Sequence, residues 1–286
     1  MRPLGNLIAK SAAQSLLIGL LLGLFSSLST AADTEPGTDT LPPLHLGDMK
    51  RERFSVVEDG KLVGGINLEI FAELAERLNL QTEHSYCPFK RCLAKLARNK
   101  IDMMMWIVKA PHRDQHIDYI QVWPGLTNIH FYTRAGDAQQ LQAYEDLRGL
   151  RIGVIRGFYY TRQFDLDKSI TKTAVETEEQ LPRMLITKRI DAFPVYGSSH
   201  VHIASEYPQL ELSEFKIPSR DMGVLAISKK SPYVAMIPEI DAALLDMIYD
   251  GTLDRIWEKY HPGRLAPVPD YIRQANPALT ASPEAE

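Results

Sequence analysis

The chain has 286 residues, of which 45% are hydrophobic and 24% are charged. These fractions are ordinary for a packed globular protein. They exclude a chain that is mainly disordered, collagen-like or coiled coil. Lys and Arg number 32 against 36 Asp and Glu, a formal net charge of −4, and there is no lysine-rich block. So little positive charge could not neutralise a run of phosphates, and we expect no nucleic-acid partner.

Residues 1–32 are typical of a secretory signal peptide. Arg2 and Lys10 are the only charged residues there, residues 17–28 are mostly apolar, and small residues follow. A positive start, a short apolar middle and a small-residue end mark a cleaved signal, whereas a membrane anchor needs ~20 apolar residues. We therefore predict a periplasmic protein whose signal is cleaved near Ala31 or Ala32.

Export changes what the two cysteines, Cys87 and Cys92, are expected to do. Two thiols in an oxidising compartment are usually paired, although two cysteines are too few for a disulfide-framework miniprotein. On one regular helix, residues five apart lie beyond bridging range. A disulfide in SYCPFKRCLAKL therefore requires Cys87 outside the helix, as its cap, with Pro88 in the first turn. A catalytic thiol is the weaker interpretation, because no base for it is recognisable.

Strands and helices alternate after a polar, proline-rich lead-in at residues 33–43. The first helix is predicted by one apolar stripe at helical spacing, formed by Ile66, Ile70, Phe71, Leu74 and Leu78. The expected elements are a strand at 44–47, this helix at 65–80, a strand near 81–84, a helix at 88–98 and a buried strand at 101–108. This order indicates an α/β layer.

The second half repeats this alternation. We expect strands at 129–134, 151–155 and 190–196, extended chain at 217–228, and helices from about 159–161, at 180–188, 237–249 and 253–260. A tail at 263–286 is rich in proline and looks loose. Two α/β halves of roughly 100 residues each fit the length.

Six segments carry a resemblance to a known family. They are, in order, DGKLVGGINLEIFAELAERLNL, CLAKLARNKIDMMM, APHRDQHIDYIQVW, YEDLRGLRIGVIRGFYY, ITKRIDAFPVY and EIDAALLDMIYDGTLDRIWEKY. Together, behind a signal peptide, they resemble the family 3 bacterial extracellular solute-binding proteins over about residues 44–262. Members of that family are periplasmic receptors that deliver polar amino acids and similar solutes to ABC importers.

The resemblance implies a two-lobed clamp of the type II periplasmic-binding-protein class, in which the chain crosses the hinge twice. Lobe 1 would comprise residues 44–133 and 221–262, and lobe 2 residues 137–217. A solute binds between the lobes, which close over it. The implied partners are a small carboxylate-bearing ligand and an inner-membrane permease. We expect a monomer without cofactor and without enzymatic activity.

The resemblance also places ligand-contacting residues. Arg113 matches the arginine that clamps the α-carboxylate of an amino acid, a task that suits the planar guanidinium fork. The other expected cleft residues are Trp106, Val108, Gly157, Phe158, Tyr159, Arg51 and Phe54. Gly157 would open a helix whose exposed backbone N–H groups favour an anion, and Phe54 lies near the family's aromatic lid.

Tyr196 is the largest departure from the family pattern. Many amino-acid receptors carry an aspartate there, which pairs with the ligand's ammonium group. Loss of a charge-assisted partner costs ~1.5–3 kcal/mol, enough to change the preferred ligand. The resemblance therefore leaves the ligand open between an amino acid and a related organic acid.

Two other functions share this fold. A periplasmic ligand sensor would use the same cleft with a membrane signalling partner. A cyclohexadienyl-dehydratase-like enzyme would need an acid in the cleft, for which Glu176, Glu178 and Asp191 are candidates. His112 and His116 have metalloprotease spacing, but Arg113 stands where that motif requires glutamate, so no metal is expected.

Overall fold

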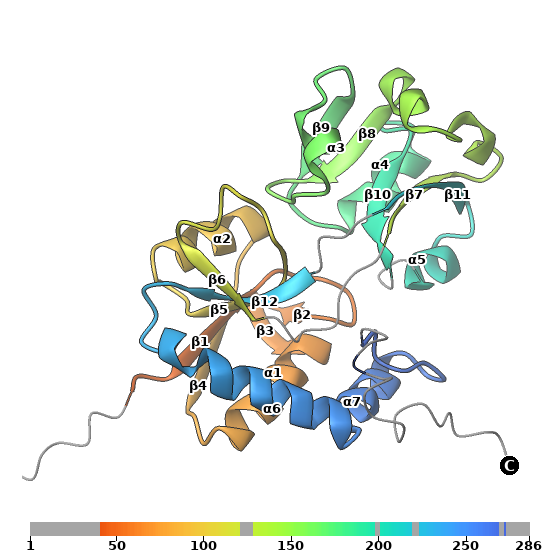
Figure 1. The fold of residues 1–286 in the computed structure, drawn as a ribbon. Coiled ribbons are helices and arrows are strands. Elements are labelled where there is room, and N and C mark those ends of the chain that lie inside the picture. Colours follow the sequence, from red (N-terminus) through yellow and green to blue (C-terminus); the bar gives the residue numbers. More distant parts are fainter. Residues whose placement is uncertain (1–40, 121–127, 198–200, 219–222, 269–271, 273–286) are drawn as a thin grey trace, which may run out of the picture. The chain divides into compact units, whose positions relative to one another are not determined.

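The computed structural model describes residues 41–120, 128–197, 201–218, 223–268 and 272 (Figure 1). The predicted signal peptide, and the lead-in up to residue 40, lie outside these residues and remain predictions. Among the described residues, no helix has the length and apolar character needed to cross a membrane.

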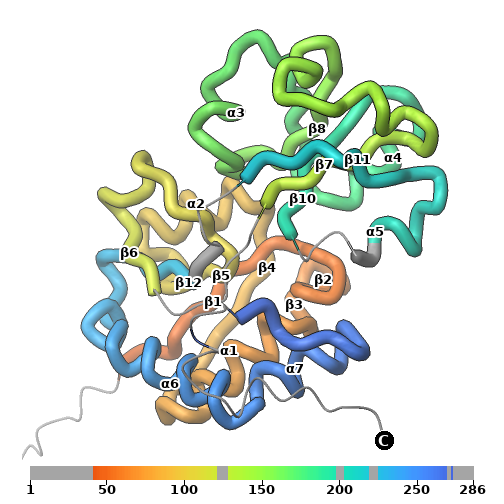
Figure 2. The backbone as a smooth tube through the Cα atoms, turned by 45° about the vertical axis from the view of Figure 1, so that its right-hand side comes forward, coloured from red at the N-terminus to blue at the C-terminus, as the bar shows by residue number. Residues whose placement is uncertain are grey.

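The first lobe is built on a five-stranded sheet of order β4-β1-β5-β12-β6. Its strands are β1 Leu44–Asp48, β4 Thr82–Tyr86, β5 Met103–Val108, β6 Ile117–Ile120 and β12 Gly223–Ser228. A short hairpin, β2 Val56–Glu58 and β3 Lys61–Gly64, follows β1. β1 runs parallel to β4 and β5, and β12 runs antiparallel to β5 and β6. Figure 2 shows β12, from the last quarter of the chain, between strands more than a hundred residues earlier.

Both faces of this sheet are covered, which is why β5 is buried at every residue. Met103 and Met105 pack with the helices on one face, and Met104 and Ile107 pack with the helix on the other. The first face carries α1 Ile66–Arg77, α6 Ile237–Tyr249 and α7 Thr252–Tyr260, and the second carries α2 Phe89–Ala97. Alternate side chains of one strand therefore belong to two separate cores.

The second lobe combines an antiparallel sheet of order β10-β7-β11 with a parallel pair, β8 and β9. Its strands are β7 Ile129–Arg134, β8 Arg151–Ile155, β9 Thr171–Val175, β10 Phe193–Tyr196 and β11 Leu210–Ile217. A bridge between Ile152 and Ala192 joins the two sheets. The helices are α3 Arg162–Leu166, α4 Gln180–Ile186 and α5 Val201–Glu206.

The chain passes between the lobes twice, from β6 to β7 and from β11 to β12, as expected for a type II clamp. The expected lobe boundary needs one correction. Residues 129–133 were expected in lobe 1, but β7 pairs on both sides with strands of lobe 2. The first crossing therefore precedes residue 129.

The predicted loose tail also differs from expectation where it is described. Ala266, Val268 and Ile272 are buried and belong to the core formed by α1, α6 and α7. The backbone N–H of Ala266 donates to the Asp254 carboxylate of α7 at 2.7 Å. The apolar side chains of this proline-rich segment therefore bury surface against the first lobe.

Candidate functional site

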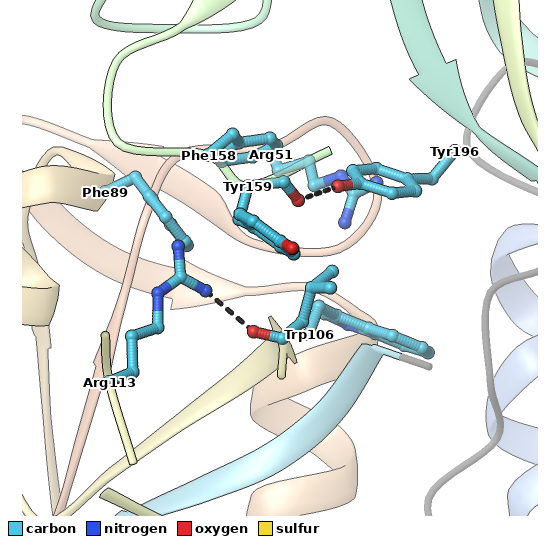
Figure 3. A pocket seen from close by; sticks show the side chains of 8 residues that line it. Arg51, Phe89, Trp106, Arg113, Phe158, Tyr159 and Tyr196 are labelled. Atoms are coloured by element: carbon cyan, nitrogen blue, oxygen red, sulfur yellow. Dashed lines mark hydrogen bonds between the residues drawn. The ribbon is translucent and has the colours of Figure 1, made fainter. Parts of the chain in front are cut away.

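A small cavity of about 10 Å³ lies between the two lobes. Figure 3 shows the side chains around it, with the Tyr159 ring of lobe 2 on the side of Arg113 and Trp106 of lobe 1. Its lining is formed by Arg51, Phe89, Trp106, Val108, Arg113, Phe158, Tyr159 and Tyr196. Seven of these eight residues were expected at the cleft, and Phe89 was not.

Arg113 contributes a buried cation to this space, with only 4% of its surface exposed. It sits in a tight turn in which its own N–H donates to Ala110 O at 2.8 Å. The guanidinium donates from Nη1 to Val108 O at 2.8 Å and from Nη2 to Gly157 O of lobe 2 at 2.9 Å.

Among the described residues no carboxylate is hydrogen-bonded to Arg113: both of its hydrogen bonds go to main-chain carbonyls, and Nε has no hydrogen-bond partner there. Asp165 acts on the guanidinium only electrostatically, without a direct contact. Burial lowers the pKa of Arg113 from its usual value. A buried cation is costly unless an anion neutralises it. The site therefore has the chemistry to receive an anionic group at this position.

Trp106 packs in the hydrophobic core of lobe 1 and also lines the small cavity. Its φ of 58° is in the left-handed region, which is strained for a bulky side chain and is tolerated where surrounding structure imposes it. Its indole Nε1 donates to Asn67 Oδ1 at 2.6 Å, and Asn67 Nδ2 donates to Asp48 Oδ2 at 2.7 Å. Burial raises the pKa of Asp48 to about 6. This network of buried hydrogen bonds holds the Trp106 side chain in its position at the cavity.

Phe54 was expected near the cleft but does not line the cavity. It is 2% exposed and packs edge-on against Trp106 and Trp257, with ring centroids 5.6 and 5.7 Å away. Arg51, whose Cζ lies 4.5 Å from the Phe54 ring centroid, reaches lobe 2 instead and pairs with Glu178 at 3.2 Å. Phe54 therefore packs behind Trp106, and Arg51 links the lobes.

Gly157 does not open a helix as expected. Its φ of 88° turns the chain, and α3 begins only at Arg162, after the N-cap Thr161. Thr161 Oγ1 accepts from Phe164 N at 3.1 Å, and the Asp165 carboxylate accepts from Tyr160 N at 2.8 Å. Side-chain caps thus occupy the amides nearest the helix start, and what Gly157 offers Arg113 is its carbonyl oxygen.

Tyr196 occupies the position where the family pattern has a carboxylate. Its ring stacks on Tyr160 with centroids 5.7 Å apart, and its hydroxyl donates to Tyr159 O. Burial raises the pKa of Tyr196 well above its usual value, so it stays neutral. The aromatic pair fixes the loop that carries Phe158 and Tyr159, and among the described residues no carboxylate lines the small cavity.

The Cys87–Cys92 disulfide is present, with a Cα–Cα distance of 5.4 Å. As required, Cys87 precedes the helix, although Pro88 and not Cys87 is the N-cap residue. Phe89, between the cysteines, faces the cavity, and its ring centroid lies 4.4 Å from that of Phe158. The signal that could have identified Phe89 is its place inside the disulfide loop, directly after a proline.

The three candidate catalytic acids do not line the small cavity, and each forms an ion pair with an arginine. Glu176 pairs with Arg156 at 2.5 Å, Glu178 with Arg51, and Asp191 with Arg151 at 2.8 Å. Within the described ranges, no group of three or more His, Cys, Asp or Glu side chains is arranged to hold a metal ion.

A larger hollow of about 430 Å³ adjoins the small cavity, and Phe158 and Tyr159 line both. Its other lining residues are Pro111, His112, Arg162, Asp165 and Leu166. This volume falls in the range of small-molecule sites. Phe158 and Tyr159 therefore separate a hollow that is large enough for a solute from the cation at Arg113.

Two α/β lobes between which the chain passes twice form the clamp of the type II periplasmic binding proteins. Residues 47–263 match the family described as bacterial extracellular solute-binding proteins, family 3. The chain belongs to this family.

Individual relatives are distant. The amino-acid-binding protein AabA of Dichelobacter nodosus is 22% identical over 205 residues, which are 70% of this chain and 80% of that protein. An ancestral arginine-binding protein bound to arginine has a TM-score of 0.67 at 20% identity, covering 77% of this chain and 99% of that one. The arginine-, lysine-, histidine-binding protein ArtJ of Geobacillus stearothermophilus has a TM-score of 0.67 at 19% identity, covering 82% and 100%. At these identities the solved structures establish the fold.

Proposed function

We propose that this chain is a periplasmic receptor that captures a small organic carboxylate, an amino acid or a related acid, between its lobes and delivers it to an ABC permease. The family supports the receptor role, and relatives named as amino-acid-binding proteins support the solute class. A sensor that passes the same binding event to a membrane signalling protein would use the same cleft and differ only in its partner.

The observation that carries the proposal is the buried Arg113, which has no directly bonded carboxylate among the described residues. A carboxylate that replaces the Gly157 carbonyl at Nη2 would accept two parallel hydrogen bonds and neutralise the charge. Removal from water strengthens such an ion pair, which is why a half-desolvated arginine is a suitable carboxylate clamp.

Entry of the solute requires movement. A space of about 10 Å³ holds roughly one water molecule, so the lobes must part, or Phe158 and Tyr159 must swing, before a larger solute reaches Arg113. Such hinge opening is the usual motion of this class of clamp. The neighbouring hollow, with its apolar walls, would then accept the body of the solute.

The residues that line the cavity indicate which solutes to test. Because Tyr196 replaces the ammonium partner, acids with an apolar or aromatic body, or with a second carboxylate, are expected to bind at least as well as simple α-amino acids. Among the described charged groups, only Asp165 offers a carboxylate at the hollow, and burial raises its pKa to about 6.

A thermal-shift screen of the purified protein tests the proposal, because a solute that binds only the folded state raises the melting temperature. The panel contains amino acids, dicarboxylates, aromatic acids and prephenate. We expect a hit among the carboxylates that is weakened about 10- to 100-fold or more in Arg113→Ala, since charge-assisted hydrogen bonds contribute ~1.5–3 kcal/mol each.

Arg134→Ala is the matched control. Arg134 is also a partly buried arginine that donates to a carbonyl, Ile190 O, at 3.0 Å, but it lies within lobe 2 and pairs with Asp137. The shift in melting temperature of the Arg134→Ala variant on adding solute should equal that of the wild type. An undiminished response in Arg113→Ala, or no response to any carboxylate, would refute the proposal. Turnover of prephenate would instead identify an enzyme.

A further inference from the structure

The loop closed by the Cys87–Cys92 disulfide carries the residues of lobe 1 that meet the Gly157 turn of lobe 2. Phe89 packs edge-on against Phe158 with ring centroids 4.4 Å apart. Lys90, the next residue, approaches Gly157 so closely that a Cβ added there would lie 3.1 Å from Lys90 Cβ and 3.4 Å from its Cα. Gly157 therefore permits a backbone approach between lobes that a side chain would obstruct.

This loop is anchored to β1 at its first cysteine, and a hydrogen bond within the loop closes the first turn of α2. The Cys87 N–H donates to Asp48 O, at the end of β1, at 3.0 Å, and the Cys92 N–H donates to Pro88 O at 2.9 Å. Both cysteines are at least 98% buried, with 2% and 0% of their surface exposed. The disulfide thus ties the entry of α2 to its own first turn, and Phe89 has little freedom to leave its position.

The same loop also contacts the arginine. The Arg113 Cζ lies 5.8 Å from the Phe89 ring centroid, within the range of a cation–π interaction. Phe89 therefore touches the two groups that define the closed arrangement, the Arg113 guanidinium and the Phe158 ring.

We propose that the disulfide loop is the lobe 1 half of the closure contact, and that the Cys87–Cys92 bridge is a positioning element that holds Phe89 and Lys90 ready for the Gly157 turn. A preorganised contact surface lowers the entropy lost on closing, so the closed form is favoured. The link to solute capture rests on the proposed function, but the contact itself can be tested without any solute.

The first test compares Gly157→Ala with Gly136→Ala by small-angle X-ray scattering of the purified protein. Both glycines have nearly the same positive φ, 88° and 87°, so alanine meets the same backbone strain. Only Gly157 faces another segment, because an added Cβ at Gly136 meets nothing within 4 Å. We expect a larger radius of gyration for Gly157→Ala and an unchanged one for Gly136→Ala. Equal radii in the two variants would overturn the proposal.

The second test removes the bridge with Cys87→Ala and Cys92→Ala together. Arg77→Ala is its control, because Arg77 holds an ion-pair cluster of lobe 1, with Glu73 at 2.8 Å and Asp250 at 2.7 Å, among residues that do not line the cavity. Circular dichroism confirms that each variant is folded. We expect the bridge variant, and not Arg77→Ala, to increase the radius of gyration.

If the bridge only stabilised lobe 1, both destabilised variants would keep the wild-type radius, and the positioning role would be wrong. If no carboxylate binds but the radii differ as expected, the closure contact stands while the proposed solute class fails.

Discussion

Asp48 is expected to make the stability of this protein depend on pH in the direction opposite to that of most carboxylates. It is 3% exposed at the end of β1 and accepts hydrogen bonds from Ser55, Asn67 Nδ2 at 2.7 Å and its neighbour Met49 N at 2.8 Å. These bonds and Arg51 favour the charged form, but the loss of hydration outweighs them and raises the pKa of Asp48 from 3.8 to about 6.

The magnitude follows from that shift. A carboxyl whose pKa rises from 3.8 to about 6 on folding changes the free energy of unfolding by about 3 kcal/mol, since one pKa unit corresponds to 1.36 kcal/mol. Between these two pH values the folded chain keeps the proton and the unfolded chain has lost it. The contribution is therefore fully present below pH 3.8 and is lost as the pH rises through about 6.

Urea denaturation of the wild type and Asp48→Asn, at intervals from below pH 3.8 to above pH 6, measures this contribution. Asn cannot titrate, and the other ionisable groups cancel in the difference between the two proteins. We expect the wild type to lose about 3 kcal/mol relative to Asp48→Asn across this interval. A difference that stays constant with pH, or that changes in the opposite sense, would refute the reasoning.

Two further predictions concern stability. Replacing Cys87 and Cys92 by Ala should lower the free energy of unfolding by about 2 kcal/mol, the chain-entropy value for so short a loop, measured by urea denaturation under oxidising conditions; no loss would contradict it. Gly65→Ala should cost at least twice as much as Gly60→Ala in the same assay, because both have positive φ but only at Gly65 would the Cβ lie 2.5 Å from Phe54 O. Equal losses would show that the hairpin shifts to make room.

The sequence predicted the bounds of a helix or strand correctly where that element has its own apolar periodicity and its own start and stop residues. The helix Ile237–Tyr249 was predicted with its observed bounds, because its apolar stripe is flanked by Pro238 at the start and Gly251 after the end. The strands β7 and β8 were also predicted at their observed bounds. In contrast, β11 was missed. Its alternation of apolar and polar residues is interrupted, because the pairing with β7 shifts register between Leu212 and Lys216. The strand depends on a partner strand from another part of the chain.

The features of the candidate site also divide into those that the sequence predicted and those that it did not. Composition, the signal-like start and the order of six segments by themselves determined an exported α/β clamp with Arg113 as its candidate anion clamp, because these features depend on residue type and local spacing. Only the tertiary structure decided that Phe54 packs behind Trp106 and that Phe89 meets Phe158. Both outcomes depend on a contact between residues distant in the sequence, and no local propensity records such a contact.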